Sequence, residues 1–194
     1  MKFWLCVSLL LAAGFSVPGA LSGGQSAAPS IGKRANETML AGLRPGRDTF
    51  AVAEKRFKPR NLQEGSLTGY REWRDDCSGK SIRLEMDAKS VIQSITITTL
   101  GAQTGTCKER PGEFLDPRNW VTGQGLRIGD SQDRVTDFYG EPNSSGPASK
   151  NGKDLALMYY QFEWAGSNVP QVMEVLCARD TGRVVEITLA FPDL

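Results

Sequence analysis

The sequence has 194 residues, a formal net charge of +1, four cysteines and no histidine. Its balanced charge argues against nucleic acid or an anionic membrane as the main partner. The lack of histidine excludes Ser-His and Cys-His nucleophile pairs and nearly every catalytic zinc arrangement.

Residues 1–22 predict a secretory signal peptide. Lys2 precedes the apolar run from Phe3 to Phe15, and small residues follow as far as Ser22. The run is too short for a comfortable membrane span, and no later stretch is apolar enough to cross a bilayer. We therefore expect a periplasmic or secreted protein without a transmembrane segment, in which residues 23–34 form a disordered linker.

A stretch that begins at Gly42 recurs at Gly125, which suggests an internal duplication. Each copy has a glycine turn, an N-cap candidate (Asp48 or Ser131) and apolar residues at helical spacing. In the second copy the apolar residues are Val135, Phe138 and Tyr139, and Gly140 is expected to end the helix. The first turn also carries Arg44 and Arg47, which suit an anion at a helix N-terminus, but Asp130 replaces Arg47 in the second copy. We interpret both turns as structural. The coinciding pairs are Gly42/Gly125, Leu43/Leu126, Arg44/Arg127, Gly46/Gly129, Val52/Val135 and Pro59/Pro142.

Three strand-like runs follow each expected helix, separated by turn residues. They span residues 69–75, 81–87 and 91–98, and then 155–164, 171–178 and 183–191. This order predicts an α+β fold of two tandem helix-plus-three-strand repeats that form an antiparallel β-sheet with the helices packed on one face. The repeats occupy residues 35–99 and 125–194, with a linker at 100–124. By composition, residues 142–153 form a mobile loop.

The second copy resembles the outer-membrane assembly lipoprotein family that contains BamE (SmpA/OmlA). The tandem arrangement is similar to the β-lactamase inhibitor protein family, whose two such repeats form one curved sheet with helices behind it. The resemblance implies this fold, and a role in envelope assembly or in enzyme inhibition. The matching residues are Gly125, Leu126, Gly129, Val135, Gly140, Pro142, Tyr160, Gly182, Val184 and Ile187.

Three cysteines follow the signal peptide, and an exported chain is expected to form a disulfide. Cys77 and Cys107 lie in connections that can meet at one end of the sheet, so we expect them to pair. Cys177 alternates with apolar residues, which predicts a buried free thiol; pairing of Cys77 with Cys177 is the alternative. Trp120, in the linker, either folds back onto the core or anchors a partner.

The sheet face away from the helices is the candidate binding surface. Alternation along residues 155–164 places Tyr159, Gln161 and Glu163 on that face. If Tyr70 aligns with Tyr160, Arg71, Trp73 and Arg83 lie there too. Scattered aromatics and arginine fit a protein-binding surface, and they also fit an ordinary solvated face.

The sequence thus favours an exported, non-enzymatic module that binds another protein. We expect no catalytic residue, no cofactor and no metal site. The alternative is a small exported hydrolase that uses two carboxylates, although no particular pair is favoured by the sequence.

Overall fold

The computed structural model describes residues 36–57, 62–64, 69–75, 79–101, 120–162 and 171–191. All of them belong to one compact unit, Lys33–Leu194. The described ranges do not include the predicted signal peptide, the expected linker 23–34, Cys77, Cys107 and Glu163.

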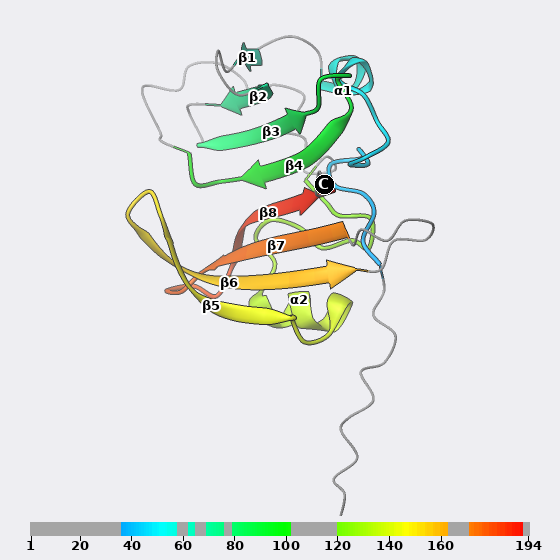
Figure 1. The fold of residues 1–194 in the computed structure, drawn as a ribbon. Coiled ribbons are helices and arrows are strands. Elements are labelled where there is room, and N and C mark those ends of the chain that lie inside the picture. The colour runs from blue at the N-terminus through cyan, green and yellow to red at the C-terminus, as the bar shows by residue number, and fades with distance from the viewer. Residues whose placement is uncertain are drawn as a thin grey trace, which may run out of the picture. The chain divides into compact units, whose positions relative to one another are not determined.

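The unit is built on one eight-stranded antiparallel sheet with the strand order β1-β2-β3-β4-β8-β7-β6-β5 (Figure 1). The strands of the first half, β1 to β4, and those of the second half, β5 to β8, meet where β4 pairs with β8. The strand bounds are β1 Leu62–Glu64, β2 Tyr70–Asp75, β3 Lys80–Met86, β4 Ile92–Thr98, β5 Ser144–Lys150, β6 Lys153–Phe162, β7 Gln171–Ala178 and β8 Val184–Ala190.

The prediction of two helix-plus-three-strand repeats is wrong. The sheet dominates the fold, and the two described helices, α1 (Phe50–Phe57) and α2 (Gln132–Tyr139), have only eight residues each. Four strands follow each helix instead of three. The additional strands are β1 and β5, which the sequence analysis did not predict. The expected mobile loop at 142–153 contains β5, which pairs with β6 along its whole length. Its Pro147 is tolerated because β5 is an edge strand.

Both helices pack on the same face of the sheet and share its apolar core. Ala53 and Phe57 of α1 and Val135 and Tyr139 of α2 are buried in this core. One row of paired residues crosses six strands of this face and is apolar throughout. From β2 to β6 it runs Trp73, Ile82, Ile97, Ile187, Val175 and Met158.

Helix α2 begins and ends where the sequence predicts. The side chain of Ser131 accepts a hydrogen bond from the Arg134 backbone N–H at 3.4 Å, as an N-cap does. Gly140 ends the helix with φ of 70°, a conformation that is cheap only for glycine. Both positions therefore fix the length of α2 locally.

The two halves hold their helix-leading turns to the sheet through equivalent backbone hydrogen bonds. Gly46 N–H donates to the Ile92 carbonyl at 2.7 Å, and Gly129 N–H donates to the Val184 carbonyl at 2.8 Å. In return, the N–H groups of Ile92 and Val184 donate to the carbonyls of Asp48 and Asp130, at 2.9 and 2.8 Å. Each turn is thus clamped to the last strand of its own half.

These bonds correct the role predicted for Asp48. Its carboxylate accepts from the Arg44 backbone N–H at 2.8 Å, just as Asp130 accepts from the Arg127 N–H at 2.8 Å. Asp48 therefore corresponds to Asp130 and not to Ser131. The two copies differ by one residue between the glycine turn and the helix, which the gapless comparison of the sequence did not reveal.

A buried carboxylate ties the segment before the first turn to the second half. Glu37 is 1% exposed and accepts from the backbone N–H groups of Thr38, Met39, Gly123 and Gln124 at 2.9–3.0 Å. Its fifth donor is the Tyr139 hydroxyl, at 2.6 Å. With every lone-pair direction used within the protein, this carboxylate is a structural anchor.

Candidate protein-binding face

The sheet face opposite the helices is the candidate functional site, and we call it the open face. Cross-strand partners point to the same side of a sheet, so the register defines three rows of residues on it. The central row, from β2 to β6, is Glu72, Arg83, Thr96, Thr188, Glu174 and Tyr159. The second is Tyr70, Glu85, Ser94, Ala190, Val172 and Gln161, and the third is Arg74, Ser81, Thr98, Glu186, Leu176 and Leu157.

Two of the five predicted binding residues lie on the open face. Tyr159 is half-buried in the central row, and Gln161 is exposed in the second row. They are neighbours on β6, two residues apart, so the structure brings them together. Glu163 lies outside the described residues.

Trp73 and Arg71 lie on the helix-covered face, so their predicted place on the open face is wrong. Trp73 is fully buried, with its ring 5.2 Å from that of Phe57 and 6.0 Å from that of Phe50. The Arg71 guanidinium lies 5.5 Å from the centre of the Phe50 ring. In the register of the sheet, Trp73 corresponds to Tyr160, because each pairs with the first buried apolar residue of the next strand (Ile82 or Met173).

The residue that the sequence analysis missed is Tyr70, which lies on the open face beside Arg83. The Arg83 guanidinium lies 4.2 Å from the centre of the Tyr70 ring and 3.1 Å from the Glu85 carboxylate. Arginine held over an aromatic ring is a geometry common at binding surfaces. The only signal in the sequence was alternation: once Trp73 faces inward, Tyr70 must face outward.

The centre of the open face is the seam between the two halves. There the hydroxyls of Thr96 on β4 and Thr188 on β8 share a hydrogen bond of 2.9 Å. This pair is partly exposed and lies between Arg83 on one side and Glu174 on the other. The central row therefore presents opposite charges on either side of a neutral centre.

The third row is closed in its middle by the chain itself. Residues 148–155, around the β5–β6 turn, form what we call the strap. The ammonium of Lys150 contacts both carboxylate oxygens of Glu186 at 2.7 Å, and the Asn151 side-chain amide donates to the Leu100 carbonyl at 2.8 Å. In Figure 1 the β5–β6 hairpin bends toward the end of β4.

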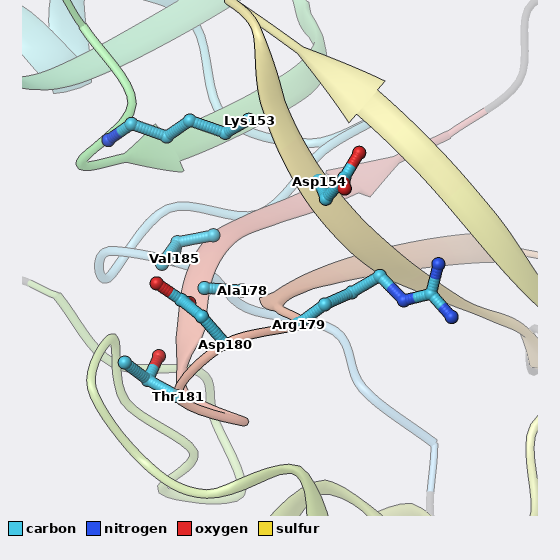
Figure 2. A pocket seen from close by; sticks show the side chains of 7 residues that line it. All are labelled: Lys153, Asp154, Ala178, Arg179, Asp180, Thr181 and Val185. Atoms are coloured by element: carbon cyan, nitrogen blue, oxygen red, sulfur yellow. The ribbon is translucent and has the colours of Figure 1, made fainter.

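A hollow of about 610 Å³ lies between the strap and the β7–β8 turn (Figure 2). The carboxylates of Asp154 and Asp180 line it but point away from each other, and the Arg179 guanidinium points outward. Such diverging groups do not form the facing carboxyl pair that a glycoside hydrolase needs. The lining residues are Lys153, Asp154, Ala178, Arg179, Asp180, Thr181 and Val185.

Other candidates for chemistry resolve into structural roles. Cys177 is a buried free thiol, as predicted, and burial raises its pKa to about 11, which disfavours the reactive thiolate. Burial and the adjacent Glu37 carboxylate raise the pKa of Tyr139 far above its usual value. Trp120 is buried in the core, as the first of its two predicted roles requires. Within the described ranges, no three acidic or cysteine side chains gather as a metal site.

Comparison with known proteins gives one distant structural likeness. No family model matches the chain, and no curated protein matches it. The solved structure of YjgB, a DUF4309 family protein from Bacillus subtilis, aligns with a TM-score of 0.45 and 11% sequence identity. The alignment covers 78% of this chain and 83% of that one.

Proposed function

We propose that this chain is an exported, non-enzymatic protein that binds another protein through the open face. The supporting observation is that Tyr70, Arg83 and Tyr159 are half-exposed on one face of the sheet, while the helices cover the other face. Tyrosine and arginine are, with tryptophan, the residue types enriched among the hot spots of protein interfaces.

The rest of the proposal draws on the sequence. Residues 1–22 support export, and the resemblance stated above supports a role in envelope assembly or in enzyme inhibition. The near-neutral charge supports a protein partner over nucleic acid. In the part of the chain that the structure describes, no helix is long and apolar enough to cross a membrane.

Site-specific photocrosslinking in the native cell tests the proposal. A photoreactive amino acid replaces Thr96, at the centre of the open face, in the full-length chain. The matched control replaces Glu54, an exposed residue of α1 on the helix side of the same half. We expect a discrete adduct with one protein from position 96 and none from position 54.

The adduct must also depend on the chemistry of the face. Arg83→Ala and Tyr159→Ala are each expected to weaken it about tenfold or more, as loss of an interface hot spot does. Gln132→Ala, at the exposed start of α2, serves as the control substitution. Equal adducts from positions 96 and 54, or an adduct unchanged by both open-face substitutions, would refute the proposal.

A further inference from the structure

The strap crosses a distance that a flat sheet does not allow. β5 and β8 are separated by β6 and β7 in the strand order. Three strand spacings amount to roughly 14 Å, and the register adds an offset of about 13 Å along the strands, because Lys150 pairs with Lys153 whereas Glu186 lies in the row of Leu157. The two together are beyond the reach of a lysine and a glutamate side chain. Because Lys150 nevertheless touches Glu186 at 2.7 Å, the hairpin must curl over the open face.

Burial along the third row shows the same cover. Glu186, the third-row residue that Lys150 contacts, is 5% exposed, whereas Thr188, the central-row residue of the same strand, is half-buried. Leu100 and Leu155, at the two ends of the covered stretch, are buried without belonging to the helix-side core. The strap thus forms a second, small buried contact on the face that would otherwise meet solvent.

The ion pair between Lys150 and Glu186 holds the strap closed, and we call this pair the latch. A buried carboxylate needs a compensating cation, because an unpaired charge is costly in a low-dielectric site. Glu186 has a 7% exposed side chain, and Lys150, its cation, is 45% exposed. Water, salt and other cations therefore reach the lysine side of the pair, whereas the glutamate side stays covered as long as the strap is closed.

We propose that the strap covers part of the protein's own binding face and so occupies the place of a partner. The Lys150–Glu186 ion pair holds the strap closed, and the strap is released when that pair is broken. Release uncovers Glu186 and Leu176 and extends the exposed face by its third row. The opened row presents a carboxylate beside apolar side chains, so it takes a basic side chain of the partner in place of Lys150. That consequence rests on the proposed function, whereas the latch itself does not.

The latch is tested on the purified mature protein without any partner. Lys150→Gln and Glu186→Gln each break the ion pair, and Lys150→Glu combined with Glu186→Lys rebuilds it with reversed charges. Hydroxyl-radical labelling followed by mass spectrometry reports access to Leu176, and hydrogen exchange reports on the amides of Asn151 to Lys153. Lys153→Gln, at an exposed lysine of the same turn, is the matched control.

We expect each single substitution to raise Leu176 labelling and amide exchange in the strap at least threefold, and the charge reversal to restore most of the protection. Labelling of Tyr70, outside the strap, is expected to stay unchanged. The latch is refuted if Lys150→Gln behaves as Lys153→Gln does. It is also refuted if the charge-reversed pair is as open as the single variants, which would mean a general loss of packing.

The crosslinking result separates this inference from the proposed function. If the single variants open the strap but position 96 gives no adduct, the latch stands and the binding function fails. If position 96 gives its adduct and the strap never opens, the function stands and the latch fails.

Discussion

At the scale of single residues, the most informative side chains are polar groups that the fold has taken out of water. Glu37 is fully buried and has five donors, while Glu186 is buried with one lysine. The first arrangement satisfies every direction around the carboxylate, so it favours one fixed conformation. The second depends on a half-exposed cation and is therefore the one that can be exchanged.

Cys177 gives a prediction with a definite pH window. Burial raises its pKa from 9.0 to about 11. Between these values the unfolded thiol ionises while the folded thiol stays protonated, so the unfolded state binds fewer protons and stability falls with rising pH. We expect the free energy of unfolding to lose about 1.4 kcal/mol per pH unit in this window on account of Cys177.

Urea unfolding at pH 8, 9, 10 and 11 measures this loss, with Cys177→Ala as the comparison. Other groups titrate in the same range, so the quantity to compare is the slope against pH in the two proteins and not the absolute stability. The stability that the protonated Cys177 thiol allows is fully present below pH 9, falls between pH 9 and pH 11, and falls no further on account of Cys177 above pH 11. Parallel slopes would show that the buried thiol is not the cause.

At the scale of elements, Trp73 attaches helix α1 to the sheet. Its ring fills the space between Phe50 and Phe57. Trp73→Ala should lower the free energy of unfolding by about 3–5 kcal/mol, the usual cost of removing a large buried aromatic side chain. Trp73→Phe keeps part of the contact and should cost less.

Tyr159→Ala is the control for this prediction, because it removes a half-buried aromatic side chain from the other face. It should change stability much less than Trp73→Ala does. Chemical denaturation of the three variants decides the matter. A Trp73→Ala protein as stable as Tyr159→Ala would place Trp73 outside the core, where the sequence had put it.

The elements also show what the sequence could and could not predict. Ser131, Gly140 and the stripe of Val135 and Tyr139 act through local geometry, and α2 was predicted from them correctly. β5 was missed because its serines, glycine and proline carry no strand preference, and only pairing with β6 makes it extended. The side chains of β2 were assigned to the wrong faces because an aromatic residue lies on each side of this strand, Tyr70 on one and Trp73 on the other. Trp73 is the buried one because it packs against Phe50 and Phe57 of α1.

At the scale of the whole molecule, the sheet is continuous across the two halves, and the helix-plus-three-strand prediction failed at the two edges of this sheet. Sequence similarity between the halves revealed the turns and the last strands, which are held by equivalent hydrogen bonds. It could not reveal β1 and β5, since edge strands are specified by a neighbour and not by their own apolar pattern. The residues of the candidate site could not all be predicted for a similar reason, because the face on which a side chain lies is known only once the register of the strands is known.

The seam between β4 and β8 predicts that both halves unfold together. Ile97 pairs with Ile187, and Ile95 pairs with Leu189, all four within the shared core. Ile97→Ala should cost about 2–5 kcal/mol, as truncation of a buried isoleucine does. Because neither half keeps a closed core without the seam, that loss should appear equally in the amides of β2–β3 and of β6–β7.

Native-state hydrogen exchange of the slowest amides measures the loss in each half separately. Thr96→Ser changes the adjacent residue of β4 on the open face but keeps the hydroxyl that bonds Thr188, so it should leave both halves within about 0.5 kcal/mol of the native protein. If Ile97→Ala accelerates exchange in β2–β3 while β6–β7 stays protected, the halves are independent units joined at an edge. Equal acceleration would mean that the sheet unfolds as one unit, so the proposed partner, bound across Thr96 and Thr188, would stabilise both halves together, since binding to the folded state alone raises its stability.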